Sequence, residues 1–425
     1  MKILVVGSGG REHALVRALA RSPQRPELLC APGNAGIAKD ARTVDVPVDD
    51  VMRLVRVAEQ EAVDLVVVGP EAPLVGGLVD ACTSSGIAAF GPTARAAKLE
   101  GSKAFAKQAM LEAGVPTAGF ELVGEVEEGM AAIARFPVVL KADGLAGGKG
   151  VVIAEDEQSA RSALEELLVD RRFGTRMVLV EEYLEGQELS LLALCDGVRA
   201  LPMAPARDFK RIFDGDAGPN TGGMGSYSPV AGVDAAATAE MVERVHQPIV
   251  DLMRGRGTPF RGVLYAGLML TPDGPKVLEF NTRFGDPETQ AVLPRLRSDL
   301  AGLLQSASED GGLEGKALQW SQDWAVTLVL ASAGYPAGTF SGNEIRGLDD
   351  VPPEVEVTHA GTAAREDGAI VTAGGRVLNV TALGPSAQIA RAAAYAAANR
   401  ISFDGMQLRS DVAAHAETPS LPIAP

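Results

Sequence analysis

Two side chains in the second half of the chain have a spacing that suits a metal ion. Glu279 and Asn281 are two positions apart in a stretch that predicts a strand, so both should point to one face. A carboxylate and an amide offer hard oxygen donors, and Mg²⁺ takes a few such protein ligands together with substrate phosphates. Arg283 follows them, and its guanidinium can bind a carboxylate or phosphate through two parallel hydrogen bonds.

A glycine-rich loop, residues 141–150 (KADGLAGGKG), lies between two predicted strands. It is not a P-loop, because neither Ser nor Thr follows its second lysine and no helix begins there. Lys141, at the end of a strand, can reach one phosphate, while Gly147 and Gly148 can fold over a triphosphate. Lys149 would bring positive charge to the transferred group. The loop therefore predicts a cover for nucleotide phosphates.

The chain of 425 residues is acidic, with 39 Lys and Arg against 55 Asp and Glu and a formal net charge of −16. Such a charge argues against a general surface for nucleic acid or anionic membranes. Cations for a phosphate must then be gathered locally, and residues 207–211 (RDFKR) supply three within five positions. With the glycine-rich residues 218–225 (GPNTGGMG), they predict a local anion site.

A glycine turn near the amino terminus, residues 7–10 (GSGG), separates a predicted strand from a predicted helix. Backbone N–H groups at such a helix start can bind an anion, and Arg11 adds a charge. A dinucleotide fingerprint is disfavoured, because Glu12 stands where its third glycine belongs and no acidic residue follows the next strand. We expect the phosphate of a small substrate here, although the turn by itself is also compatible with no ligand.

The predicted elements fall into three regions. Apolar strands at 3–6, 28–30 and 65–68 alternate with helices, which predicts a doubly wound parallel sheet domain over residues 1–101. A central α+β domain follows over residues 102–320, with a mobile lobe at about 117–190. Residues 321–425 predict a small mixed α/β domain.

Three local features of these regions can be checked directly. We expect one alanine- and lysine-rich helix over residues 93–113, and a hairpin over 263–280 that turns at Asp273 and Gly274. The turn 285–288 (GDPE) should open a helix with Pro287 at its first position.

The remaining composition indicates a soluble cytoplasmic protein. Three scattered cysteines suit a reduced compartment and predict small buried side chains instead of disulfides or a metal cluster. The amino terminus lacks the pattern of a signal peptide, and no run is apolar enough to span a bilayer. Because no long apolar patch is evident, we expect a monomer.

The motifs together resemble those of the ATP-grasp ligases, and within them the phosphoribosylamine–glycine ligase family. The resemblance covers nearly the whole chain and rests on these segments: 7–14 (GSGGREHA), 31–36 (APGNAG), 141–150 (KADGLAGGKG), 219–225 (PNTGGMG), 264–269 (LYAGLM), 279–290 (EFNTRFGDPETQ) and 359–362 (HAGT). The RFGDPE element is specific to this family, whereas the glycine loop is shared across the wider fold.

The resemblance implies a reaction in de novo purine biosynthesis. ATP would phosphorylate the carboxylate of glycine, and the amine of 5-phosphoribosylamine would displace phosphate from the glycyl phosphate to form the amide. Direct attack on a carboxylate is slow because oxide is a poor leaving group, and the acyl phosphate removes that obstacle. Catalysis would depend on holding anions together and neutralising their charge.

The resemblance also implies roles for individual residues. ATP would be held by Lys103, Lys141, Gly147, Gly148, Lys149, Glu181, Tyr183, Leu184 and Glu188. Mg²⁺, with Mn²⁺ as an alternative, would bind Glu279 and Asn281. The substrates would contact Gly9, Gly10, Arg11, Asn34, Asn220, Thr221, Gly222, Arg283, Asp286, Pro287 and Glu288. The catalytic set would be Lys149, Asp208, Lys210 and Arg283.

One position departs from the family pattern, and three alternatives stay open. The family usually has histidine where this chain has Phe209, which puts any contact of that imidazole in doubt. The nearest alternative is another ATP-grasp ligase, such as a carboxylase of biotin or of a purine intermediate, which lacks the RFGDPE turn. Passive nucleotide binding and a dehydrogenase are the other two.

Overall fold

The computed structural model describes residues 1–145 and 150–418. The amino-terminal domain is a five-stranded parallel sheet in the order β3-β2-β1-β4-β5. Its strands are β1 (Lys2–Gly7), β2 (Glu27–Pro32), β3 (Arg42–Thr43), β4 (Leu65–Val68) and β5 (Ala88–Phe90). Its helices are α1 (Gly10–Ala20), α2 (Ile37–Asp40), α3 (Val51–Gln60), α4 (Glu71–Val75) and α5 (Leu78–Ser84).

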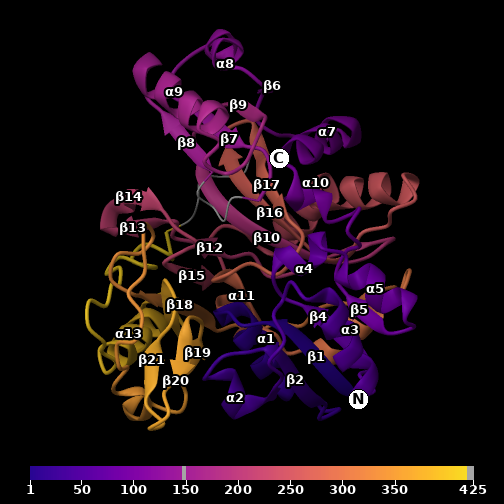
Figure 1. Cartoon of the computed structure of the whole chain (residues 1–425), viewed down its shortest axis with the longest axis vertical. Helices are drawn as coiled ribbons and strands as arrows, with labels where there is room; N and C mark the ends of the chain where they lie inside the picture. Colours follow the sequence, from indigo (N-terminus) through magenta and orange to yellow (C-terminus); the bar gives the residue numbers. More distant parts are fainter. Residues whose placement is uncertain (146–149, 419–425) are drawn as a thin grey trace.

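Both faces of this sheet are buried, as the apolar strands predicted. Ile3 and Val5 of β1 pack in one hydrophobic cluster with α1, whereas Leu4 and Val6 pack in another with α3 and α5. Alternate residues of a strand point to opposite faces, so an apolar residue is needed at each of the positions 3–6 of β1. The predicted doubly wound domain is therefore confirmed (Figure 1).

The predicted lobe is a four-stranded antiparallel sheet in the order β6-β9-β7-β8. It consists of β6 (Phe120–Val123), β7 (Val138–Ala142), β8 (Val151–Ala154) and β9 (Val178–Glu182), with helices α8 (Val126–Ala132) and α9 (Glu157–Leu164). These elements share a small hydrophobic core of their own. The lobe projects from the rest of the molecule at the top of Figure 1.

The expected helix over residues 93–113 is interrupted, which corrects the prediction. Two helices stand in its place, α6 (Lys98–Gly101) and α7 (Lys103–Ala113). Between them Ser102 has extended backbone angles, and its hydroxyl accepts a hydrogen bond from Phe105 N at 3.1 Å as an N-cap. Serine competes for backbone hydrogen bonds and so favours a cap over a helix interior.

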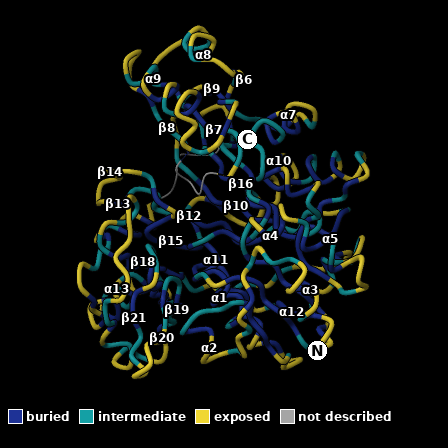
Figure 2. Tube along the Cα trace, in the orientation of Figure 1, coloured by how far each residue is buried: buried dark blue, intermediate teal, exposed yellow. Residues whose placement is uncertain are grey.

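A second antiparallel sheet, in the order β11-β10-β16-β17, forms the centre of the molecule. Its strands are β10 (Gln187–Asp196), β11 (Ala200–Pro202), β16 (Arg261–Thr271) and β17 (Gly274–Asn281). The predicted hairpin is confirmed, but its turn lies one residue earlier than predicted, at Pro272 and Asp273, because Gly274 already pairs with Thr271. Leu189 and Leu191 pack toward α10 (Ala235–Gly255). Leu192 and Leu194 pack toward α12 (Leu300–Ala307) and the amino-terminal domain. Most of the sheet is dark in Figure 2 because both faces are covered.

The carboxy-terminal sheet has the order β12-β15-β18-β22-β19, and all its pairings are antiparallel. Its strands are β12 (Arg207–Asp208), β15 (Gly225–Ser228), β18 (Trp324–Ala331), β19 (Glu356–His359) and β22 (Arg376–Gly384), with α13 (Ala387–Ala398) packed against β18 and β22. Two hairpins, β13 (Arg211–Phe213) with β14 (Ala217–Asn220) and β20 (Thr362–Ala364) with β21 (Ile370–Thr372), extend from this region. Residues of the RDFKR and PNTGGMG segments thus join a sheet that belongs mainly to the last hundred residues.

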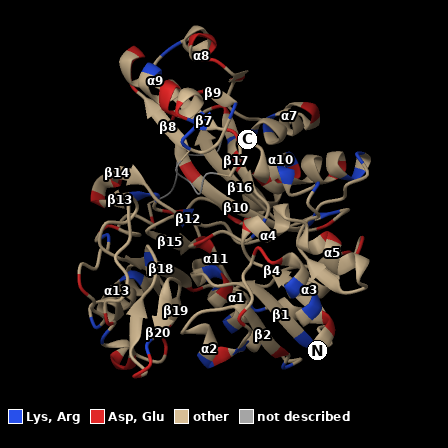
Figure 3. Ribbon diagram, in the orientation of Figure 1, with Lys and Arg blue, Asp and Glu red and all other residues tan. Residues whose placement is uncertain are grey.

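The remaining sequence features also have a structural outcome. Cys30, Cys82 and Cys195 are buried and free, as predicted. Acidic and basic side chains are interspersed over the outer helices (Figure 3). Within residues 1–145 and 150–418, no helix is long and apolar enough to cross a membrane.

A buried histidine in α10 should make the fold sensitive to acid. His246 is fully buried, and its Nε2 lies 3.2 Å from Leu191 O. Burial lowers the pKa of His246 from 6.5 to about 4, so between these pH values only the unfolded chain takes up the proton. Stability present above pH 6.5 is therefore lost as the pH falls toward 4, by about 2 kcal/mol at pH 5. His246→Gln should lose less stability than the parent chain between pH 7 and pH 5 in urea unfolding, whereas His415→Gln, at an exposed position, should match the parent.

Candidate functional site

A cleft of about 1360 Å³ lies where the lobe, the central sheet, the amino-terminal domain and the carboxy-terminal domain meet. It is much larger than a single small substrate requires, since ligand pockets usually measure about 300–1,000 Å³. Many predicted site residues line it: Arg11, Lys103, Lys141, Glu181, Tyr183, Leu184, Glu188, Asp208, Lys210, Asn220, Thr221, Gly222, Glu279, Asn281, Arg283, Asp286 and Glu288. Gly9, Gly10, Asn34 and Pro287 are not among the lining residues. Gly147, Gly148 and Lys149 lie outside the described residues.

A buried cluster of two lysines and one carboxylate stands at the lobe end of the cleft. Glu181 Oε2 accepts hydrogen bonds from Lys141 Nζ at 2.9 Å and Lys107 Nζ at 3.0 Å. All three side chains are less than a tenth exposed, and burial lowers the pKa of Lys107 to about 8 although Glu181 opposes the shift. Glu181 Oε1 is buried without a hydrogen-bond partner in the described part of the chain. The two lysines therefore leave the cluster with an excess positive charge that could bind an anion. Glu181 Oε1 could accept a hydrogen bond from a ligand.

The glycine loop is anchored to the start of α7. Lys103 Nζ donates to Gly144 O at 2.9 Å, and the Asp143 carboxylate accepts from Ser102 Oγ and Ala104 N, each at 3.1 Å. Burial lowers the pKa of Lys103, and the nearby Glu279 carboxylate partly opposes the shift. The broken helix thus places Lys103 and the described beginning of the loop beside each other at the cleft.

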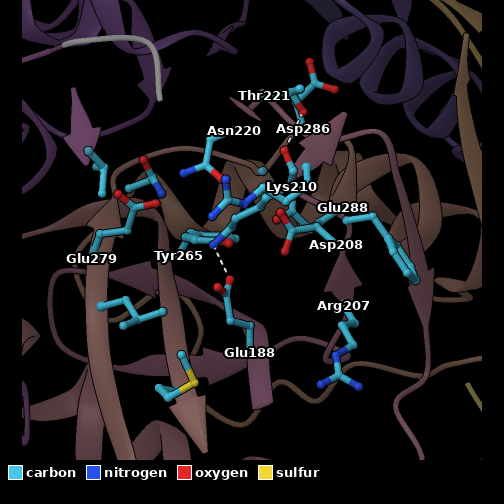
Figure 4. Close-up of a pocket in the computed structure, with 18 of the residues that line it drawn as sticks. Glu188, Arg207, Asp208, Lys210, Asn220, Thr221, Tyr265, Glu279, Asp286 and Glu288 are labelled. Carbon is cyan, nitrogen blue, oxygen red and sulfur yellow. Dashed lines mark hydrogen bonds and ion pairs between the residues drawn. The ribbon is translucent and has the colours of Figure 1, made fainter. Parts of the chain in front are cut away.

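Glu279 and Asn281, the predicted metal ligands, both face the cleft from β17 (Figure 4 labels Glu279). Burial alone would raise the pKa of Glu279, but Lys210, Lys141 and Lys103 together lower it below its ordinary value, so Glu279 is a carboxylate. The described residues contain no group of three His, Cys, Asp or Glu side chains that could hold a metal without help. The donor set fits Mg²⁺, which binds to one or two protein oxygens when phosphates complete its shell.

The RDFKR segment contributes a second set of charges. Lys210 Nζ forms an ion pair with Glu188, as Figure 4 shows, and Asp208 lies in the same part of the cleft. Burial raises the pKa of Asp208 to about 7; Lys210 opposes this shift, and Glu288 adds to it. Asp208 can therefore accept and release a proton near neutral pH.

Phe209 stands where the resemblance led us to expect histidine. Its ring centroid lies 6.2 Å from that of Tyr227, and the Arg409 guanidinium lies 4.9 Å from the Phe209 centroid. Arg409 belongs to the carboxy-terminal domain, is 1% exposed and also donates to Arg211 O at 3.0 Å. A cation above an aromatic face is stabilising, so Phe209 links the segment after β12 to the carboxy-terminal domain without an imidazole.

Arg283 is held by two carboxylates of the region that precedes the lobe. Its Nε lies 3.2 Å from Glu71 Oε2, and its Nη2 lies 3.0 Å from Glu100 Oε1. Glu100 is buried, and its other oxygen accepts from Thr282 N at 2.7 Å. The carboxylates of Glu71 and Glu100 therefore orient the Arg283 guanidinium, which the sequence predicted to bind a substrate anion.

The GDPE turn points its two acids to different partners. Glu288 Oε1 accepts from Ser190 Oγ at 3.0 Å, and that hydroxyl lies 3.0 Å from Tyr265 Oη. Asp286 Oδ2 lies 3.0 Å from Arg376 Nη2, which comes from β22. Helix α11 (Glu288–Val292) begins one residue later than predicted, because Pro287 is its N-cap and not its first residue.

The amino-terminal glycine turn is closed by the carboxylate of Glu12. Gly9 N donates to Glu12 Oε2 at 2.6 Å, and Arg11 Nε donates to Glu12 Oε1 at 2.6 Å. The amide of Asn34 accepts from Gly36 N and Ile37 N, both at 2.9 Å, and donates to backbone carbonyls of the amino- and carboxy-terminal domains. An anion bound at Gly9 N would have to displace Glu12, so the predicted substrate roles of Gly9, Gly10 and Asn34 stay predictions.

Sequence reasoning missed several charged residues of the cleft, among them Lys107, Glu71, Glu100 and Arg376. Of these four, only Lys107 left a signal, because it lies four positions after Lys103 on a predicted helix and so shares its face. The other three come from segments far from the motifs, and only the packing of the domains brings them to the site.

Comparisons with known proteins follow the same division of the chain. Three family models match: the phosphoribosylglycinamide synthetase N domain at residues 1–100, its ATP-grasp (A) domain at 101–289 and its C domain at 325–415. Phosphoribosylamine–glycine ligase of Streptomyces coelicolor is 51% identical over 422 residues, which cover 98% of this chain and 99% of that protein. The enzyme of Xanthomonas axonopodis pv. citri is 49% identical and covers 97% of both chains.

Solved structures agree with these matches. The crystal structure of phosphoribosylamine–glycine ligase from Thermotoga maritima superposes with a TM-score of 0.84 at 34% identity, covering 97% of this chain and all (100%) of that one. The biotin carboxylase domain of 2-oxoglutarate carboxylase from Hydrogenobacter thermophilus, solved with MgADP and bicarbonate, has a TM-score of 0.71 at 19% identity over 96% of this chain and 91% of that one. That second likeness shows the fold alone.

The fold is therefore that of an ATP-grasp protein, and Lys103, Lys141 and Glu279 line its cleft. Within that class, the chain belongs to the phosphoribosylglycinamide synthetase family, whose three domain models cover most of its length.

The lysine cluster leads to a prediction about nucleotide affinity. Lys141→Met removes one charge-assisted contact and leaves Glu181 with Lys107 alone, so we expect the dissociation constant of MgATP to rise about tenfold or more, about 1.4 kcal/mol. Titration calorimetry of the full-length protein measures this constant. Lys276→Met, on β17 but outside the cleft, is the matched control, and an unchanged constant in Lys141→Met would contradict the assignment.

Proposed function

We propose that this protein catalyses the ATP-dependent ligation of glycine to 5-phosphoribosylamine, which gives glycinamide ribonucleotide, ADP and phosphate. The observation that carries the proposal is a single cleft that joins Lys103 and Lys141, the acidic strand end at Glu279 and the GDPE turn. Membership of the phosphoribosylglycinamide synthetase family supports the same reaction and its place in purine biosynthesis.

The reaction divides into two transfers. First, a carboxylate oxygen of glycine attacks the γ-phosphorus, the bond to the β-phosphate oxygen breaks, and ADP leaves. The amine nitrogen of 5-phosphoribosylamine then attacks the carbonyl carbon of glycyl phosphate, inorganic phosphate leaves, and the nitrogen loses a proton. We assign that proton to Asp208, whose pKa is raised by burial to about 7, close to the ordinary working range of a general base.

The lysines hold and neutralise the phosphates of ATP. Lys103 and Lys141 face Glu279 across the cleft, and Lys149 is proposed to bring positive charge to the phosphoryl group that is transferred. Mg²⁺, with Mn²⁺ as an alternative, would be held by Glu279 and Asn281 and would neutralise phosphate charge when bound. Glu181 and Glu188, with Tyr183 and Leu184 between them, line the part of the cleft proposed for the nucleoside.

The two remaining substrates are assigned to the opposite end. Arg283 and the Asp286–Glu288 turn are proposed to face glycine and its acyl phosphate. Arg11 and the Asn220–Gly222 loop are proposed for 5-phosphoribosylamine, together with Gly9, Gly10 and Asn34. The monomeric state and the cytoplasmic location expected from the sequence also stay predictions.

A coupled assay of ADP release tests the proposed reaction. Purified protein with MgATP should release ADP only when glycine and 5-phosphoribosylamine are both present, because the acyl phosphate is consumed by the amine. Replacing glycine by bicarbonate tests a carboxylase with the same fold. Equal ADP release with bicarbonate, or release with neither substrate, would overturn the assignment.

The metal site leads to a separate prediction. Glu279→Ala removes the carboxylate proposed for Mg²⁺, so turnover should fall by two orders of magnitude or more while the melting temperature changes little. Glu309→Ala, at an exposed position, is the control for loss of a carboxylate. Turnover equal to that of the parent protein across a Mg²⁺ titration would remove Glu279 from the metal site.

A further inference from the structure

Arg376 is one of the residues through which the carboxy-terminal domain reaches into the cleft. Arg376, the first residue of β22, donates from Nη1 to Gly222 O at 2.6 Å and to Asp286 O at 2.7 Å. Its Nη2 forms an ion pair with Asp286 Oδ2 at 3.0 Å. One guanidinium therefore holds the PNTGGMG loop and the GDPE turn at a fixed separation.

A second residue of the same domain holds the other side of Gly222. Gly222 N donates to Tyr335 Oη at 2.9 Å, so the two peptide groups that flank Gly222 are each bound by a carboxy-terminal side chain. A Cβ at Gly222 would lie 2.9 Å from Arg376 Cζ, so a side chain at this position would displace the guanidinium. Gly223 has a φ of +107°, and a Cβ there would lie 2.4 Å from Pro287 Cδ. The loop is thus enclosed between the carboxy-terminal domain and the GDPE turn.

The nucleotide end of the cleft does not depend on these contacts. Lys103 bonds to Gly144, Lys141 bonds to Leu278 and Glu181, and none of these partners belongs to the carboxy-terminal domain. Arg376 and Asp286 are largely buried, with 20% and 14% of their side chains exposed. Among the described residues, replacing Arg376 would leave the Asp286 carboxylate with the Gln290 amide, at 2.7 Å, as its remaining side-chain hydrogen bond. Loss of a partner from a buried ion pair is costly and local.

We propose that Arg376 and Tyr335 are positioning residues by which the carboxy-terminal domain assembles the glycine and amine end of the cleft, while the ATP end is assembled without it. The inference rests on the proposed function for the identity of the substrates. Its structural part, a loop ordered by two side chains from another domain, is independent of that function.

Steady-state kinetics of the full-length protein test the catalytic part. In Arg376→Met, kcat/KM for glycine and for 5-phosphoribosylamine should fall about 100-fold, while the dissociation constant of MgATP stays within about twofold. Tyr335→Phe, which removes one hydroxyl, should show the same pattern with about a tenfold loss. Arg376→Lys should recover part of the activity, because one ammonium can serve a carbonyl but cannot bridge both loops. Arg346→Met, an exposed arginine of the same domain (74% exposed), is the control.

Hydrogen exchange of the amides tests the structural part without activity. In Arg376→Met and Tyr335→Phe, exchange should accelerate in peptides that cover residues 218–225 and 285–288, and stay unchanged in the lobe strands. Parent-like exchange in both segments would overturn the inference whatever the reaction is. MgATP affinity that falls as much as kcat/KM would also overturn it, since the residues would then support the whole fold. If the parent protein failed to turn over glycine and the amine, the proposed function would fall and the exchange data would still decide the positioning role.

Discussion

A buried charge needs a partner, and this requirement organises the whole cleft. Glu181 lies between Lys107 and Lys141, Arg283 lies between Glu71 and Glu100, and Arg376 holds Asp286. Removing a charge from water without compensation costs several kcal/mol, on the order of 3–5 when a buried pair is broken. Lys141 and Glu181 pair within the lobe, on strands β7 and β9. The partners of Arg283 and of Asp286 come from distant segments of the chain, so these ion pairs form only when the domains dock correctly.

The same compensation explains how an acidic protein can bind phosphates. With a net charge of −16, the chain has no general affinity for anions, and its useful cations stay in the cleft beside fixed carboxylates. Around Glu279, three lysines outweigh the effect of burial and keep the carboxylate ionised. A magnesium nucleotide would bring the cation for Glu279 and the phosphates for the lysines together. Neither the metal ion nor the phosphates would then have to enter the cleft alone.

Strands from two regions of the sequence share one sheet beside the end of the cleft that contains the GDPE turn. Strands β12 and β15 belong to the middle of the sequence, yet they pair in the carboxy-terminal sheet beside β18. Phe209 contacts Arg409 at the same boundary, and Gly222 is held by Arg376 and Tyr335. The lobe, in contrast, has its own small core and can keep its fold while its position changes. A cleft end held together by two regions, beneath a lobe with its own core, suits a reaction that must exclude water from an acyl phosphate.

The sequence by itself determined the parallel sheet, the hairpin at Asp273 and the shared face of Glu279 and Asn281, because these follow from local periodicity and turn chemistry. By themselves the motifs predicted phosphate and metal binding, and their resemblance to the phosphoribosylamine–glycine ligase family indicated the reaction. Tertiary structure alone decided that Ser102 divides the predicted helix and that Glu12 occupies the anion position of the glycine turn. It alone brought Glu100 and Arg376 into the cleft. Their contacts join residues that are 182 and 90 positions apart in the chain, and such contacts depend on domain docking, which leaves no periodic pattern in the sequence.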